Sequence, residues 1–207
     1  MTQIATPDAV LTFWFGDHKP GHQPAPTVRR RWFAGGAEFD DAVRARFADT
    51  VSLAVRGRLD HWQESPGEQL ALILLSDQFT RNIYRGSHQA FSGDPIALAT
   101  CQAMIRDNLQ TLLGLDQRAF LGMPLEHSEQ PEVQDQSVAY FDQLQQEYSQ
   151  ANGADAAQDE RAQSYYRFAV AHREVISQFG RFPHRNSALG RESTPEEQEW
   201  LDNGGGF

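Results

Sequence analysis

The sequence predicts an all-α protein, an irregular stack of antiparallel helix pairs with seven or eight helices. Helix-start signals recur, since a capping residue stands directly before a proline at Thr6, Ser65, Asp94 and Thr194. Glycines close the periodic stretches, at Gly16, Gly57, Gly86, Gly114 and Gly180. No segment alternates apolar and polar residues as a half-buried strand does. These three observations favour helices throughout.

The expected helices follow in chain order. The first begins after Thr6, where Pro7 suits the first helical position. Segment 37–56 places Phe39, Val43 and Phe47 on one side and charges on the other, which is typical of an outer amphipathic helix. The run 70–75 is apolar all round, which predicts a central helix buried on every side.

The second half of the chain adds five helical segments, and the links between them are short, which favours antiparallel neighbours. They are expected at about 95–109, 117–121, 132–150, 159–179 and 195–201. A chain of 207 residues suits one domain, 1–207, with its core in about 5–201 and a flexible glycine-rich C-terminal tail.

Composition restricts the possible partners. The formal net charge of -10 argues against nucleic acid and against an anionic membrane surface, because both are bound through basic faces. No stretch approaches the roughly 20 apolar residues of a membrane span. The single cysteine, Cys101, suits a reducing compartment. We therefore expect a soluble cytoplasmic protein, whose oligomeric state the sequence leaves open.

Two arginine-rich segments, 77–86 and 178–186, concentrate positive charge in this acidic chain. A guanidinium group binds carboxylate or phosphate in bidentate fashion. The first hypothesis is therefore a shared pocket for an anionic ligand. Its candidate residues are Arg81, Asn82, Arg85, Arg181, His184, Arg185, Asn186 and Arg191. The alternative is a structural network without ligand, in which the arginines cap helix ends and pair with internal acids such as Asp77, Glu126 and Glu129.

A third hypothesis is an enzyme, such as a hydrolase acting on an anionic substrate. Segment 123–129 places His127 between carboxylates, so His127, Glu129 and His184 are the candidates for acid-base catalysis. Against this, Ser128 and Glu129 also suit the start of the next helix. No His-Glu-x-x-His motif, cysteine pair, phosphate loop or dinucleotide fingerprint occurs, so we expect neither a metal nor a cofactor. His172 lies on the apolar face of its helix and is interpreted as a core histidine.

The motifs together resemble a known family. They are Phe-Trp-Phe-Gly at 13–16, Arg-Trp-Phe at 31–33, Asp-Gln-Phe-x-Arg-Asn-Ile-Tyr-Arg-Gly at 77–86, His-Ser-Glu at 127–129 and Arg-Phe-Pro-His-Arg-Asn at 181–186. From about residue 9 to residue 201 the chain is similar to the bacterial domain-of-unknown-function family numbered 924. It differs at Thr80, where the family usually carries proline, and at Gly122 and Glu126, where an aromatic and an apolar residue are usual.

The resemblance implies a helical fold similar to the tetratricopeptide-repeat-like superhelix, with no established reaction. Because the arginines concentrate positive charge in an acidic chain, the leading hypothesis is a ligand-binding or protein-interaction module. Its arginine-rich pocket would take an anionic small molecule or an acidic peptide segment.

Overall fold

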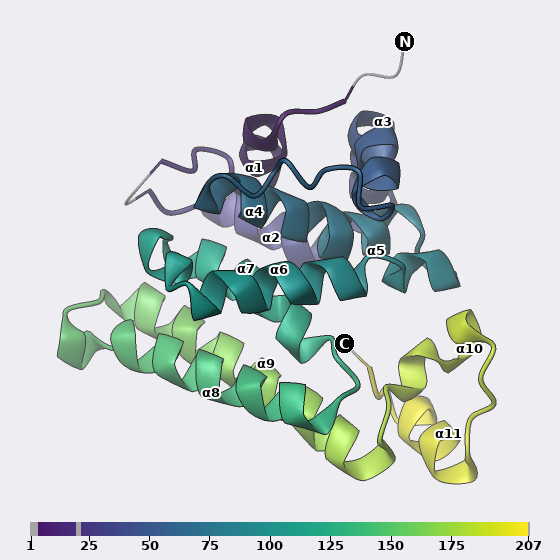
Figure 1. Cartoon of the computed structure of the whole chain (residues 1–207). Helices are drawn as coiled ribbons and strands as arrows, with labels where there is room; N and C mark the ends of the chain where they lie inside the picture. Colours follow the sequence, from purple (N-terminus) through teal and green to yellow (C-terminus); the bar gives the residue numbers. More distant parts are fainter. Residues whose placement is uncertain (1–3, 20–21, 207) are drawn as a thin grey trace. The chain divides into compact units, whose positions relative to one another are not determined.

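The computed structural model describes residues 4–19 and 22–206. Throughout these residues the regular structure is helical, with no strand, which confirms the all-α class (Figure 1). The α-helical segments run from α1 to α11, more than the seven or eight expected, because segments as short as α5 (Thr80–Ile83) and α10 (Asn186–Leu189) show no periodicity of their own. Phe207, at the end of the predicted flexible tail, lies outside the described residues.

The chain divides into two compact units. The first comprises the residues up to 85 together with 89–124, and the second comprises 86–88 and the residues from 125 on. The single domain over 1–207 and the superhelical stacking of helix pairs stay predictions.

The first unit is built around a central helix, as the apolar run at 70–75 predicts. The described helices that contribute to it are α1 (Pro7–Phe15), α2 (Pro26–Ala34), α3 (Gly36–Ala54), α4 (Pro66–Ile73), α5, α6 (Asp94–Arg106) and most of α7 (Leu115–Glu126). Helix α4 packs against α1 and α6. Its last four residues are almost fully buried. Trp14, Phe79 and Phe120 fill the space beside it, with the Trp14 ring centroid 5.4 Å from that of Phe79 and 5.3 Å from that of Phe120.

Helix α4 continues as a π-helix, Leu74–Phe79, before α5 begins. This segment buries the polar side chains of Ser76 and Asp77, and Thr80 at the start of α5 is buried with them. The Thr80 hydroxyl donates to the carbonyl oxygen of Ser76 at 2.9 Å. Gly93 lies directly against the same carbonyl, because a Cβ atom at position 93 would stand 2.1 Å from that oxygen. The widened turn therefore depends on a neighbour without a side chain.

The second unit consists mainly of a helix hairpin. Helices α8 (Pro131–Glu147) and α9 (Ala156–Phe179) lie side by side, joined by a short connection that contains the 3-10 helix Gln150–Asn152 (Figure 1). Asp155 forms a capping box with Gln158 at the start of α9, and Gly180 ends the helix with a φ of 70°. The short helix α10 and helix α11 (Pro195–Asp202) complete the unit.

A small core lies where the hairpin meets the C-terminal segment. Val175, Ile176 and Phe182 are buried there, with Phe179 and Trp200 packed against them. Close to the C-terminus, the Gly205 amide donates to the Trp200 carbonyl at 2.9 Å. Across the described ranges, no helix combines the length and the apolar character that a bilayer span requires.

Candidate functional site

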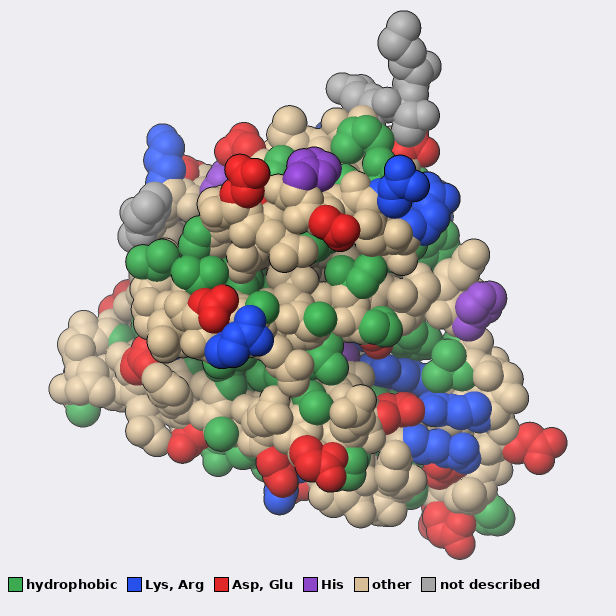
Figure 2. Space-filling view, in the orientation of Figure 1, with side chains coloured by type: hydrophobic (Ala, Val, Ile, Leu, Met, Phe, Trp, Pro, Cys, Tyr) green, Lys and Arg blue, Asp and Glu red, His purple; other side chains and the backbone are tan. Residues whose placement is uncertain are grey.

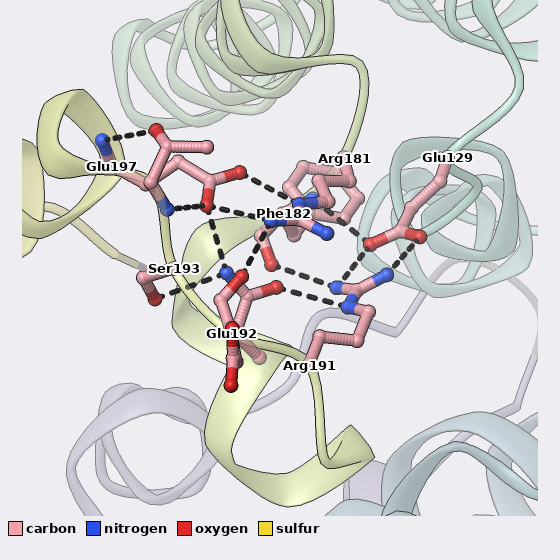
Figure 3. A network of polar contacts seen from close by, with 9 residues as sticks. Glu129, Arg181, Phe182, Arg191, Glu192, Ser193 and Glu197 are labelled. Atoms are coloured by element: carbon pink, nitrogen blue, oxygen red, sulfur yellow. Dashed lines mark hydrogen bonds and ion pairs between the residues drawn. The ribbon is translucent and has the colours of Figure 1, made fainter.

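The second arginine-rich segment begins where α9 ends. Gly180 adopts a left-handed conformation that turns the chain out of the helix. Phe182 is then extended, as expected for a residue before proline, and Pro183 begins a 3-10 helix, Pro183–Arg185. The turn places Arg181 and Arg185 on a short, rigid segment. Arg181 and Asn186 of this segment form a polar network with Glu129, Arg191 and Glu197 (Figure 3).

Arg191 and Glu129 form a bidentate pair. Arg191 Nη1 donates to Glu129 Oε2 at 2.7 Å and Nη2 donates to Oε1 at 2.9 Å. Arg191 also donates from Nε to Asn186 Oδ1 at 2.9 Å. The Phe182 amide donates to Glu129 Oε1 at 2.9 Å. Partial burial would raise the pKa of Glu129, but these donors outweigh it and hold the pKa below its ordinary value. Glu129 is therefore an ionised partner of Arg191 at neutral pH.

Arg181 and Glu197 form the second pair of the network. Arg181 Nε donates to Glu197 Oε1 at 2.7 Å and Nη2 donates to Oε2 at 2.8 Å. The Glu197 side chain is only 3% exposed, and it also accepts from the Thr194 amide at 2.8 Å and from Asn186 Nδ2 at 3.1 Å. The hydrogen bonds from Arg181 are the main cause that lowers the pKa of Glu197 to about 2. Because Asn186 contacts both pairs, it joins them into one network.

The space-filling view agrees with this pairing. Basic and acidic side chains lie next to one another over the part of the second unit that contains α10 and α11 (Figure 2). The positive charge of this segment is thus largely matched by carboxylates. The network fixes the backbone of this turn at Phe182. The Phe182 amide donates to Glu129, and the Phe182 carbonyl accepts from Arg191.

A second group of side chains surrounds the Phe182 ring. We call it the histidine–arginine cluster, and its members are His127, His172, His184 and Arg185. The Arg185 guanidinium carbon lies 4.6 Å from the centroid of the Phe182 ring. The His172 and His184 rings lie 5.7 Å and 5.5 Å from that centroid, and His127 lies 6.1 Å from His172. His172 and Arg185 are buried, whereas His127 and His184 are half-buried.

His172 is a buried neutral histidine, as the sequence indicates. Its Nδ1 lies 2.8 Å from the Phe168 carbonyl oxygen, which can only accept, so this nitrogen carries the proton. Glu126 Oε2, 3.8 Å from the same nitrogen, would favour the charged ring. Burial outweighs it and lowers the pKa of His172 to about 3, and the nearby charges of His127, Arg185 and His184 act in the same direction. His172 is therefore neutral at neutral pH.

The first arginine-rich segment lies in the first unit, where its side chains have carboxylate partners. Arg81 donates to Asp94 Oδ1 from Nη1 at 2.9 Å and to Oδ2 from Nη2 at 3.2 Å. Arg85 donates to Asp40 Oδ2 from Nε at 2.8 Å, and Asn82 donates to Asp40 Oδ1 at 2.7 Å. Arg81 also pairs with Asp77, four residues earlier, as helical spacing predicts. Asp40 and Asp94 were not predicted as partners of these arginines.

The structure thus places the predicted site residues in two groups. Arg81, Asn82 and Arg85 belong to the first unit, and the second unit brings together Arg181, His184, Arg185, Asn186, Arg191, His127 and Glu129. A pocket with arginines from both segments stays a prediction. Glu197, which is not among the predicted site residues, also forms a capping box with Thr194 at the start of α11. Over the described residues, no three His, Cys, Asp or Glu side chains are grouped so that they could hold a metal ion.

The fold and this site define an all-helical protein in which Arg81, Arg85, Arg181 and Arg191 are paired with its own carboxylates. Comparison with known sequences identifies its family. The chain belongs to the family described as bacterial protein of unknown function, DUF924, whose model matches residues 10–205. It is 32% identical to a protein of unknown function from Agrobacterium tumefaciens whose structure has been solved, with 95% of this chain and 97% of that chain covered and a TM-score of 0.77. No curated protein matches the sequence.

Proposed function

We propose that the second unit is a binding module that holds a small anion, a phosphate or a carboxylate, at the histidine–arginine cluster. The observation that carries the proposal is the convergence on the Phe182 ring of one guanidinium group and the imidazole rings of His172 and His184, with His127 beside His172. A guanidinium group binds phosphate or carboxylate through several hydrogen bonds, and the ring N–H of an imidazole can add a donor.

The arrangement of the two arginine pairs supports this proposal. Arg181 and Arg191 are occupied by Glu197 and Glu129, and they hold the turn that carries His184 and Arg185. A rigid turn reduces the entropy that a ligand would have to remove on binding. The half-buried positions of His127 and His184 keep part of each side chain in reach of solvent. Arg185, in contrast, would bind its ligand from a largely desolvated position, where charge-assisted hydrogen bonds are stronger.

A structural role is the second candidate, and a specific observation favours it for Arg181 and Arg191. Both oxygens of Glu129 and of Glu197 accept hydrogen bonds from these arginines. We therefore assign these two arginines to the scaffold. The enzyme hypothesis has less support, because Glu129, its proposed acid-base partner, is engaged by Arg191 and by the Phe182 amide.

The test is a thermal-shift titration at constant ionic strength with phosphate, citrate and an acidic peptide, and with chloride as the reference salt. Binding to the native state raises its stability by RT ln(1 + [L]/Kd), about 2.7 kcal/mol at 100 times Kd. We expect phosphate or citrate to raise the Tm of the wild-type protein, and the rise to be lost in Arg185→Gln and reduced in His184→Gln.

Arg173→Gln is the matched control, because Arg173 lies in the same unit in an exposed pair with Asp135. It should keep the full rise in Tm. Circular dichroism verifies that each variant is folded. An equal rise in wild type and in folded Arg185→Gln would refute the proposal, and a rise with the acidic peptide alone would replace the small anion by a protein partner.

A further inference from the structure

A cavity of about 470 Å³ lies in the second unit, in a part of it that shares no residue with the histidine–arginine cluster. It is lined by the end of α8, by the connection that follows and by the first half of α9. Its volume falls within the range of roughly 300–1,000 Å³ that is typical of small-molecule sites. Nothing in the function proposed above uses it.

Helical spacing gathers the α9 side chains of this cavity. Asp159, Gln163, Tyr166 and Arg167 occupy positions i, i+4, i+7 and i+8, which lie on one face of a helix. Across from them, Gln145 and Gln146 line the cavity from the last turn of α8. The capping box of Asp155 with Gln158 fixes the start of α9, so this face has a defined position next to α8.

The lining is rich in side-chain amides that are already oriented. Gln145 Nε2 and Gln146 Nε2 each donate to the Asp142 carboxylate at 2.9 Å. Gln163 Nε2 donates to Asp159 Oδ1 at 2.7 Å. Each amide keeps a second N–H and a carbonyl oxygen that make no hydrogen bond to any described part of the chain. The cavity therefore offers donors and acceptors side by side.

The charges of the cavity cancel, since Asp159 and Arg167 are the charged residues that line it. Tyr166 adds a half-buried aromatic ring with a hydroxyl group. A lining of this kind does not suit an anion, which would meet the Asp159 carboxylate, and it is too polar for an apolar ligand. It suits a ligand whose groups both donate and accept hydrogen bonds and which also has a C–H face for the ring.

We propose that this cavity binds a neutral saccharide of about the size of one sugar ring. Sugar hydroxyls are donors and acceptors at once, like the amides of Gln145, Gln146 and Gln163. The C–H face of a pyranose would lie on the Tyr166 ring. Asp159 would accept from a hydroxyl and Arg167 would donate to one.

The experiment is a two-dimensional amide NMR titration of the full chain with glucose, galactose, N-acetylglucosamine and glucuronate. We expect saturable shifts of the amide signals of 145–167 with at least one neutral sugar. Because each lost hydrogen bond weakens binding about three- to tenfold, Gln163→Ala and Tyr166→Ala should each raise the Kd by that factor. Gln143→Ala is the matched control, since Gln143 is an exposed α8 residue that pairs with Glu147 and does not line the cavity.

Three results would overturn the proposal. The first is the absence of saturable shifts with every neutral sugar up to about 100 mM, a concentration far above the roughly millimolar Kd of weak binding. The second is that saturable shifts occur only in other parts of the chain. The third is that glucuronate binds more tightly than any neutral sugar. Equal Kd values for wild type, Gln163→Ala and Tyr166→Ala would also overturn it. These substitutions are at solvent-reachable positions, so their folding is readily confirmed from the same spectra.

Discussion

Glu129 and Arg191 stand 62 residues apart in the sequence and form two hydrogen bonds, of 2.7 Å and 2.9 Å, in the second unit. This pair connects the segment before α8 with the segment between α10 and α11. It also encloses the Phe182 backbone, whose amide donates to Glu129 and whose carbonyl accepts from Arg191. One ion pair thus fixes the turn that carries His184 and Arg185.

We expect a double-mutant cycle with Glu129→Gln and Arg191→Gln to give a coupling energy of about 1–3 kcal/mol in the free energy of unfolding. Both side chains are mostly buried, so solvent screens the pair only in part. The Asp135–Arg173 pair is the control, because its side chains are 64% and 49% exposed and it should couple by about 1 kcal/mol or less. Urea denaturation measures both, and equal coupling in the two pairs would contradict the scaffold role.

The Glu197 carboxylate should make the stability depend on acid pH. Its pKa is about 2 in the folded chain, against an ordinary value of 4.5, so the unfolded chain takes up the proton first as pH falls. The stabilisation is therefore complete above about pH 4.5 and is lost progressively between pH 4.5 and pH 2. Urea midpoints over this range should fall less steeply for Glu197→Gln than for wild type, and parallel curves would show that Glu197 does not titrate as proposed.

His172 should add a pH dependence at higher pH. Its pKa is about 3 in the folded chain and 6.5 when unperturbed. Between these two pH values the ring is protonated in the unfolded chain and neutral in the folded chain. Stability should fall by about 2 kcal/mol between pH 6.5 and pH 5 from this residue alone. The groups that face it are Glu126, His127, His184 and Arg185.

The His172→Gln variant should show a flatter profile in this window. A substitution at a buried position can itself change the stability. The titration of the His172 ring is therefore also followed directly by its NMR signal in the wild-type protein. That signal should stay at its neutral position down to about pH 4. A midpoint near pH 6.5 would show that the ring is solvated and is not kept neutral by burial.

Gly93→Ala should destabilise the first unit. A Cβ atom at position 93 would stand 2.1 Å from the carbonyl oxygen of Ser76, which belongs to a buried π-helix and has little room to move. We expect a loss of about 1–3 kcal/mol or more in the free energy of unfolding, as for other overpacked positions. Gly67→Ala is the control, because its added Cβ would meet Leu11 Cδ1 at an ordinary 3.6 Å. Equal denaturation midpoints in the two variants would contradict the close approach.

The long helices could be predicted because local chemistry fixes their ends. Thr6, Ser65 and Thr194 accept hydrogen bonds from the first turns of α1, α4 and α11, as their positions before proline indicate. Asp94 was predicted as a cap in the same way, and this was wrong. Helix α6 begins at Asp94 itself, with Gly93 as its cap, and the Asp94 carboxylate binds Arg81. A long-range partner competes with the local one for the same oxygens, and the sequence does not reveal it.

Other elements could not be predicted for similar reasons. Helix α2 was missed because its polar, arginine-rich segment lacks a continuous apolar stripe, although Trp32 is buried. Helix α7 was expected only at 117–121 but runs through Pro124 to Glu126. In the candidate site, the arginines and Glu129 as an acidic partner were predicted, whereas pairing with Asp40, Asp94 or Glu197 depends on which helices pack together. Residue types alone did not distinguish the hypothesis of an anion-binding pocket from that of a structural network.

The π-helix at Leu74–Phe79 places one more residue in its turn than an α-helix would hold. Each residue of an α-helix rotates the chain by about 100°. The wide turn takes up its extra residue locally, so Arg81, Asn82 and Arg85 after it keep the facing that their pairs with Asp94 and Asp40 require. One residue added to or taken from a regular α-helical part of this helix would have no such outlet and would rotate the three side chains by about 100°.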